Sequence, residues 1–383
     1  METPVPGRIR GVKPFLVMDI LERARQLEAE GREVIHLEVG EPDFDSPPAA
    51  VRAAQRALAE GHTHYTTALG LPELREAIAD HHNRAYGLSI SPSRVAVTLG
   101  TSAAMLMLFA LLLEEGDEVI LSDPHYACYP SFILSAGGKP VRVPARAEEG
   151  FILRAEAVRP RIGPRTRAIL VNSPSNPTGS RLPPAELAEL ASLGIPLISD
   201  EIYHGLSYGE RDRSALEYQP EAFVINGFSK YFAMTGWRLG YLILPGRYVR
   251  PLEILQQNYF VSPNPFVQLG GLAALRECVP DAERMRAVYA ERRKVMLRGL
   301  REIGLPIPQE PDGAFYVFAD ARAHGGDSLA LAREILEATG VAVAPGADFG
   351  PGGEGHLRFS YCNSAGNIEK GLRRVGEFLK GKK

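Results

Sequence analysis

Residues 222–244, AFVINGFSKYFAMTGWRLGYLIL, contain two apolar runs separated by a polar segment that carries two glycines. We expect strands at Ala222 to Asn226 and at Leu239 to Leu244, because short apolar runs with such boundaries are typical of strands buried on both faces. Lys230 lies between the two predicted strands. A lysine just past an apolar strand can be partly desolvated, which lowers its pKa and makes its amine a usable nucleophile.

The same alternation of short apolar runs with helical patterns extends from about residue 46 to residue 285. Five further strands are predicted, at Val95 to Leu99, Glu118 to Leu121, Pro140 to Val143, Ala168 to Val171 and Pro196 to Ser199. Strands that alternate with helices indicate a parallel sheet covered by helices on both faces. The predicted fold class is therefore α/β, with a mostly parallel seven-stranded sheet in a large domain.

The pattern changes after about residue 285. A long charged helix is predicted over residues 283–304, and short strands are predicted in DGAFYVFAD, VAVAPGADFG and HLRFSY, which indicates a smaller α+β domain. A helix is also expected at Met18 to Gly31 and a strand at Val34 to Val39. The predicted division is an N-terminal arm and a segment packing with the small domain (1–45), a large ligand-binding domain (46–285) and a small C-terminal domain (286–383).

Composition excludes several classes of partner. A formal net charge of -3 and a pI near 6.3 give no basic surplus for nucleic acid or an anionic membrane, so a small-molecule ligand is expected. The longest apolar stretch, Ala103 to Leu113, is shorter than the roughly 20 residues that span a bilayer, and it predicts a buried helix. Three scattered cysteines and an N-terminus without an apolar run behind its charges favour a reducing cytoplasm and no signal peptide.

Three weaker features are set aside. Residues 350–355, GPGGEG, fit the GxGxxG pattern, but a proline interrupts the loop and a predicted strand follows it, so we expect no nicotinamide site. His81 and His82 are adjacent on a helical pattern and cannot share a face, and both are expected at the surface. The sequence has neither HExxH nor CxxC, and no metal is expected.

Small and polar residues follow the predicted strands where the strands end. The segments are LGTS, SDPHY, VNSPSNPTG, SDEIY and NGFSK, in chain order. Open parallel sheets bind ligands beyond the carboxyl ends of their strands. We therefore expect the functional site at this edge of the sheet, beside Lys230.

Residues 227–240, GFSKYFAMTGWRLG, resemble the lysine signature of the class I and II aminotransferases, which are pyridoxal-phosphate enzymes of fold type I. The resemblance runs from about residue 12 to the C-terminus. It implies that Lys230 forms a Schiff base with pyridoxal 5'-phosphate, and that Ser229 and Arg238 hold the cofactor phosphate.

Other segments match this family in order, and the resemblance assigns their roles. Asp200 would contact the pyridine nitrogen, Tyr203 and Asn176 the phenolic oxygen, and Tyr126 the face of the ring. The phosphate would have three further ligands in the segment between a predicted strand and helix: Gly100, Thr101 and Ser102. Asp200, Tyr203 and Lys230 are the expected catalytic residues.

The resemblance also implies substrate and subunit contacts. Arg358 would hold the substrate α-carboxylate, since a guanidinium binds a carboxylate through two parallel hydrogen bonds. Gly40 and Asn176 would contact the same substrate. Tyr65 would reach the phosphate of a neighbouring subunit, so a homodimer with shared active sites is expected.

The implied function is transfer of the amino group of an L-amino acid to a 2-oxo acid by a ping-pong mechanism. A β-elimination carbon-sulfur lyase, which shares the same lysine, aspartate and arginine, is the alternative. A DNA-binding sensor is disfavoured, because the first forty residues are too few for a helix-turn-helix domain. Aspartate, alanine, aromatic and branched-chain donors all remain open; a second cation for an acidic donor would have to come from Arg8, Arg10, Lys13 or a partner subunit.

Overall fold

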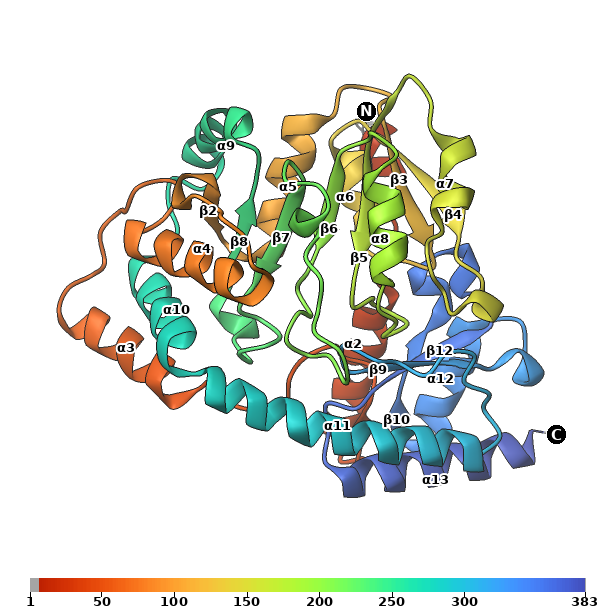
Figure 1. Ribbon diagram of the computed structural model, residues 1–383. Coiled ribbons are helices and arrows are strands. Elements are labelled where there is room, and N and C mark those ends of the chain that lie inside the picture. The colour runs from red at the N-terminus through yellow and green to blue at the C-terminus, as the bar shows by residue number, and fades with distance from the viewer. Residues whose placement is uncertain (1–6, 383) are drawn as a thin grey trace, which may run out of the picture.

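The computed structural model describes residues 7–382, and a seven-stranded sheet lies at its centre (Figure 1). The strand order is β2-β8-β7-β6-β5-β3-β4. The bounds are β2 Val95–Thr98, β3 Glu118–Asp123, β4 Lys139–Pro144, β5 Thr166–Asn172, β6 Leu197–Asp200, β7 Phe223–Gly227 and β8 Gly240–Ile243. All seven predicted strands are confirmed. β8 runs antiparallel to β2 and β7, and the other neighbouring strands run parallel.

Helices cover both faces of this sheet, as the apolar strands require. Alternate residues of one strand contribute to two separate cores: Val224 packs on the face of α4 and α10, and Phe223 and Ile225 pack on the face of α5 and α9. The helices of this region are α3 Pro48–Ala59, α4 Pro72–Tyr86, α5 Gly100–Leu112, α6 Tyr129–Ser135, α7 Ala155–Val158, α8 Pro184–Ala191, α9 Gly246–Tyr259 and α10 Pro265–Glu277. The apolar stretch at Ala103 is therefore the buried helix that was predicted.

The C-terminal part builds two small sheets. β11 (Ala344–Pro345), β12 (His356–Ser360) and β9 (Tyr316–Asp320) form an antiparallel sheet with β12 in the middle. The predicted charged helix is α11, Val279–Glu302, which runs along the lower edge of the molecule and packs against α13, Ala365–Gly381 (Figure 1). α12 spans Ser328–Thr339. The division at residue 285 remains a prediction, and α11 is continuous across it.

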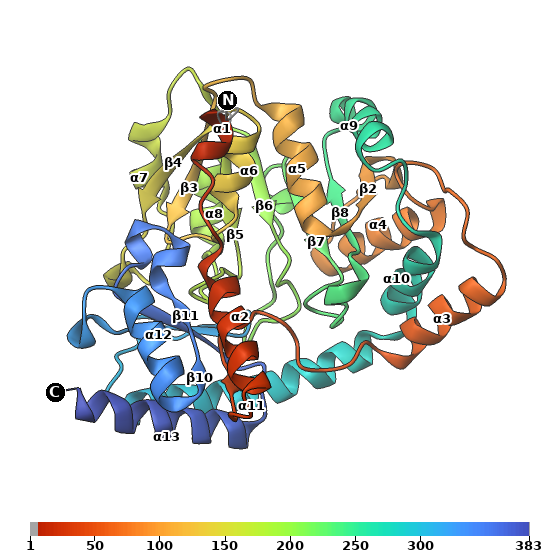
Figure 2. The same ribbon diagram turned by 180° about the vertical axis from the view of Figure 1, so that it is seen from behind.

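The N-terminal segment packs against these C-terminal elements. β1 (Ile35–His36) pairs in parallel with β10 (Val341–Ala342), and α2 (Leu16–Ala29) contacts α12 and β11. Figure 2 shows α2 in red beside the blue C-terminal elements. Residues 7–10 form a short helix, α1 Gly7–Arg10. None of the helices in residues 7–382 is long and apolar enough to cross a membrane.

Candidate active site

A cavity of about 230 Å³ lies beyond the carboxyl ends of β5, β6 and β7 and extends to β12 and α2. The structure brings together at this cavity most of the residues that the sequence predicted: Gly40, Thr101, Ser102, Tyr126, Asn176, Asp200, Tyr203, Ser229, Lys230, Arg238 and Arg358. Gly100 lies directly beside Arg238. Tyr65 does not line the cavity and is 84% exposed.

Lys230 follows β7 and points into the cavity. Its Nζ donates a hydrogen bond of 2.6 Å to the backbone oxygen of Gly40. Burial lowers the pKa of Lys230 to about 8, because a desolvated ammonium is disfavoured relative to the neutral amine. The fraction of Lys230 that is a free amine near neutral pH is therefore larger than for an ordinary exposed lysine, and the free amine is the form that a nucleophile requires.

Asp200 ends β6 and is 3% exposed. It accepts hydrogen bonds from the hydroxyl of Tyr129 at 2.7 Å and from the backbone N–H of Ile202 at 3.2 Å. Burial raises the pKa of Asp200 to about 6, although the two hydrogen bonds by themselves lower it. Within residues 7–382 no lysine, arginine or histidine forms an ion pair with this carboxylate, so a cationic ligand group in the cavity would be its counter-ion.

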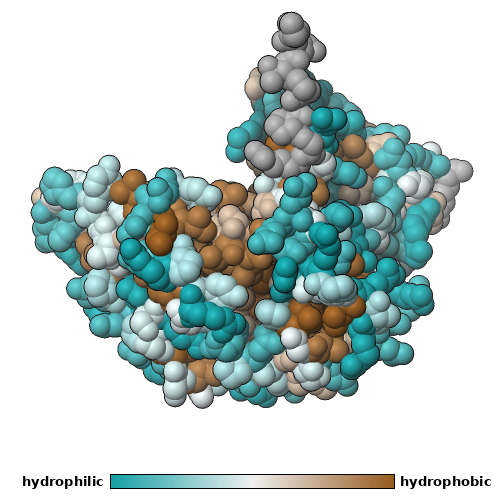
Figure 3. All heavy atoms as spheres, turned by 90° about the horizontal axis from the view of Figure 1, so that it is seen from above, coloured by the Kyte–Doolittle hydropathy of each residue, from teal (hydrophilic) through white to brown (hydrophobic). Residues whose placement is uncertain are grey.

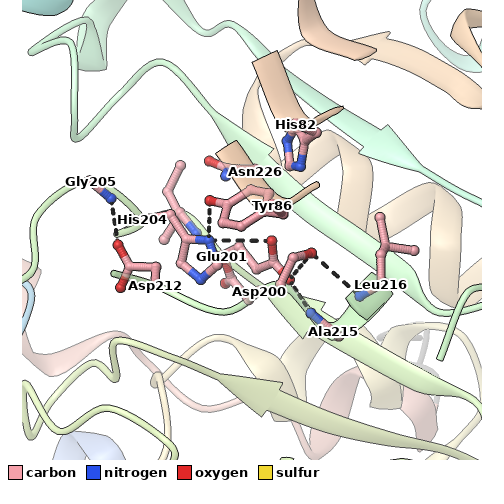
Figure 4. Close-up of polar contacts among 12 residues, drawn as sticks. His82, Tyr86, Asp200, Glu201, His204, Gly205, Asp212, Ala215, Leu216 and Asn226 are labelled. Atoms are coloured by element: carbon pink, nitrogen blue, oxygen red, sulfur yellow. Dashed lines mark hydrogen bonds and ion pairs between the residues drawn. The ribbon is translucent and has the colours of Figure 1, made fainter. Parts of the chain in front are cut away.

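Glu201, the next residue, belongs to a different buried network (Figure 4). Its carboxylate accepts hydrogen bonds from the Ser214 hydroxyl at 3.0 Å and the Ala215 N–H at 2.9 Å, and it lies 3.4 Å from Nδ1 of His204. The hydroxyl of Tyr86 lies 2.8 Å from the same nitrogen. Two adjacent carboxylates at the end of β6, Asp200 and Glu201, thus belong to the cavity and to the scaffold respectively.

The prediction that His82 lies at the surface is wrong. α4 turns His82 toward the sheet, where its side chain is fully buried and its Nε2 lies 2.9 Å from the hydroxyl of Tyr241 on β8. Burial lowers the pKa of His82 well below its ordinary value. His81, on the neighbouring face, is half-buried and lines a different cavity, with His204. Adjacent positions on a helix point about 100° apart, so one of the two can face the core.

One end of the cavity suits an anion. Arg238 lies at the rim and donates from Nη1 to the backbone oxygen of Thr235 at 3.0 Å. A Cβ at Gly100 would lie 2.7 Å from Nη2 of Arg238, and Gly100 has φ +79°, so glycine allows this close approach at the start of α5. No side chain caps α5, which leaves the N–H groups of its first turn for a ligand.

Arg358 marks the other end. It is 2% exposed, because β12 is the central strand of its sheet. Nη1 donates to Oδ1 of Asn176 at 2.8 Å, Nη2 donates to the backbone oxygen of Glu38, and the buried Nε has no partner within residues 7–382. The guanidinium carbon lies 4.3 Å from the ring centre of Tyr316. A buried cation without a carboxylate is poised to bind one.

Two tyrosines were not predicted as part of the site. The hydroxyl of Tyr316 lies 2.8 Å from that of Tyr203, and both side chains are buried. A Cβ at Gly40 would lie 1.9 Å from the Tyr316 hydroxyl, so Gly40 must be a glycine. Tyr129 holds Asp200. Tyr316 and Tyr129 sit in apolar segments and contact residues far away in sequence, so their positions in the chain gave no signal of this role.

The charges that line the cavity fit pyridoxal phosphate and an amino acid. Lys230, Arg238 and Arg358 form no ion pair within residues 7–382, and Asp200 is the one carboxylate in the lining of that part of the chain. A phosphate, an α-carboxylate and a protonated pyridine nitrogen would balance the two arginines and Asp200. Fold and cavity together define an α/β enzyme of pyridoxal-phosphate chemistry.

Comparison with known proteins gives the family. Residues 32–375 match the model of the family described as "Aminotransferase class I and II". The chain belongs to this family, whose members use pyridoxal phosphate, and it is an aminotransferase.

Its relatives match over nearly their whole length. The valine–pyruvate aminotransferase of Mycobacterium tuberculosis is 38% identical over 96% of this chain and 97% of its own. The aspartate/prephenate aminotransferase of Thermus thermophilus is 40% identical over 97% and 98%. The solved structure of Thermus thermophilus aspartate aminotransferase with maleate superposes with a TM-score of 0.94, at 40% identity over 98% of this chain and 99% of that one. The names of these relatives differ in the amino donor.

Proposed function

We propose that the protein transfers the amino group of an L-amino acid to a 2-oxo acid by a ping-pong mechanism, with pyridoxal 5'-phosphate bound covalently at Lys230. The observation that carries the proposal is the position of the buried Lys230 in a cavity between Asp200 and Arg358, neither of which forms an ion pair within residues 7–382. When bound, pyridoxal phosphate supplies an electron-withdrawing ring that stabilises the substrate carbon as its proton leaves.

The residues of the sheet edge would hold the cofactor. Asp200 binds the pyridine nitrogen, and as a buried carboxylate it keeps that nitrogen protonated. Tyr203 and Asn176 bind the phenolic oxygen, and Tyr126 covers the ring. The phosphate is held by Ser229, Arg238 and the start of α5, which comprises Gly100, Thr101 and Ser102.

The substrate would be oriented by its carboxylate. Arg358 binds the α-carboxylate through its guanidinium, with Asn176 and the backbone of Gly40 beside it. The amine of Lys230 would hold and move the proton of the α-carbon. The hydrogen bond from Lys230 to the backbone oxygen of Gly40 supports this role, because Gly40 is a proposed substrate contact.

The active enzyme is proposed to be a homodimer. Tyr65, largely exposed in one chain, would complete the phosphate site of a second copy. Large hydrophobic side chains also remain exposed on α5 and α9, namely Leu106, Ile254 and Tyr259. Figure 3 shows hydrophobic residues gathered in a hollow on the face seen from above.

All three cysteines are free, which fits a reducing cytoplasm, where we place the enzyme.

An acceptor test decides whether the activity is amino transfer. The purified holoenzyme is given an amino acid with and without a 2-oxo acid, and product is followed over many turnovers. We expect the donor's 2-oxo acid to accumulate beyond one equivalent per subunit only when the acceptor is present. Sustained release of pyruvate and ammonia from a cysteine derivative without acceptor would instead indicate β-elimination and overturn the proposal.

A further inference from the structure

The cavity has an apolar wall beside Arg358. The start of α2 forms this wall together with Val39 and with Met105, which lies on α5. This part of the wall consists of Val17 and Met18 on α2 and of Phe15, which directly precedes the helix. The edge of the Phe15 ring faces Tyr126, with 6.1 Å between the ring centres. The apolar wall therefore reaches from the proposed cofactor ring toward the carboxylate site.

Two contacts fix the start of α2 in this place. The backbone N–H groups of Leu16 and Val17 donate to the carboxylate of Asp348 at 2.9 and 3.1 Å. Val17 packs in one buried cluster with Phe349, whose ring centre lies 4.9 Å from the guanidinium carbon of Arg358. A substrate held by Arg358 would thus have its side chain close to this wall.

The cations of the cavity all have other proposed ligands. Within the described part of the chain, the lining contains Lys230, Arg238 and Arg358 and no further lysine, arginine or histidine. Lys13 lines a neighbouring cavity together with His125 and Asp348. Arg10 is exposed on α1. The side chain of Arg8 lies outside the described residues. Among the described residues of one chain, the cavity lining therefore offers a substrate carboxylate near Val17 and Met105 no cation beyond those already assigned.

We propose that this wall selects amino donors with uncharged, apolar side chains, and that aspartate and glutamate are poor donors. The inference rests on the proposed function, because it takes the α-carboxylate to be bound at Arg358. The names of the relatives do not decide between these donors, because two are named for aspartate and one for valine and pyruvate.

The test follows the first half-reaction of the wild-type holoenzyme by the change in visible absorbance of its cofactor. Leucine, valine and phenylalanine are compared with aspartate and glutamate, without acceptor. We expect kcat/KM for leucine and phenylalanine to exceed that for aspartate by at least about 100-fold, the scale on which a mismatched site rejects a substrate. Aspartate or glutamate reacting as fast as leucine would overturn the inference. If no amino acid changes the spectrum, the proposed function fails first and the inference with it.

A pair of variants tests the wall itself. Met18 is 50% exposed, so the backbone position tolerates a longer polar side chain. We expect Met18→Arg to raise the ratio of aspartate to leucine kcat/KM about tenfold or more over the matched neutral variant Met18→Gln, because a charge-assisted hydrogen bond becomes available. Equal ratios in the two variants would place the substrate side chain away from α2 and contradict the assignment of this wall.

Discussion

At one end of the cavity Asp200 ends one strand of the seven-stranded sheet and Lys230 follows another, whereas at the other end Arg358 lies on a three-stranded sheet near apolar side chains of α2. The first end is made by loops at one sheet edge and carries the charges proposed for the cofactor. The second end is assembled from segments at opposite ends of the chain and is the proposed site of the substrate. On the proposed function, chemistry and substrate choice lie in different parts of the fold, so we expect that each can be changed alone.

The largest change to the sheet end is expected from Asp200→Asn. Without the buried carboxylate the pyridine nitrogen would lose its proton, so turnover should fall by about 10²- to 10³-fold, the scale of removing one electrostatic group from an active site. The matched control is Glu201→Gln, next in sequence but in the separate network with His204. That variant should lower the free energy of unfolding by about 1 to 3 kcal/mol and retain turnover within a few-fold. An equal loss of turnover in the Asp200→Asn and Glu201→Gln variants would contradict separate roles for the two carboxylates.

Arg358→Lys tests the substrate end with a smaller expected effect. An ammonium cannot make the paired hydrogen bonds of a guanidinium, so transition-state binding of an amino acid should weaken by about 1.5 to 3 kcal/mol. The corresponding fall in kcat/KM is roughly 10- to 150-fold. The loss should vanish for a primary amine without an α-carboxylate. Arg322→Lys, at an exposed arginine, serves as control. An equal loss with the amine would show that Arg358 does not bind the carboxylate.

The smallest expected effect concerns the stability of the substrate end. His36 lies 2.7 Å from the buried carboxylate of Glu38, whose backbone oxygen accepts from Arg358. Its hydrogen bond to Glu38 raises the pKa of His36 to about 9 in the folded state. A raised pKa contributes stability that is fully present below about pH 6.5 and is lost as the pH rises through 9. Unfolding by denaturant from pH 6 to pH 10 should show this fall, and His36→Asn should flatten it; parallel curves for the two proteins would refute the assignment.

The sequence predicted the sheet end of the site well, and the substrate end in part. The strand before Asp200 and the strand before Lys230 are continuous apolar runs, so both their existence and the polar residues after them are local signals. Tyr129 and Tyr316 escaped prediction because they contact Asp200 and Tyr203 across 71 and 113 residues of sequence. The apolar wall had no local signal either, since Val17 and Phe349 meet only after the chain has folded. His82 was predicted at the surface, yet adjacent helical residues point about 100° apart, so His82 can face Tyr241 on β8 while His81 does not.

Reduction of the holoenzyme with borohydride, followed by digestion and mass spectrometry, tests the role of Lys230 most directly. We expect the reduced cofactor on the peptide that contains Lys230 in the wild type and in Lys294→Ala, a variant at an exposed lysine. Lys230→Ala should carry no such adduct, should lack the visible absorbance band, and should keep its fold by circular dichroism. A cofactor adduct on any other lysine, or an unchanged band in Lys230→Ala, would contradict the assignment of Lys230 as the anchor.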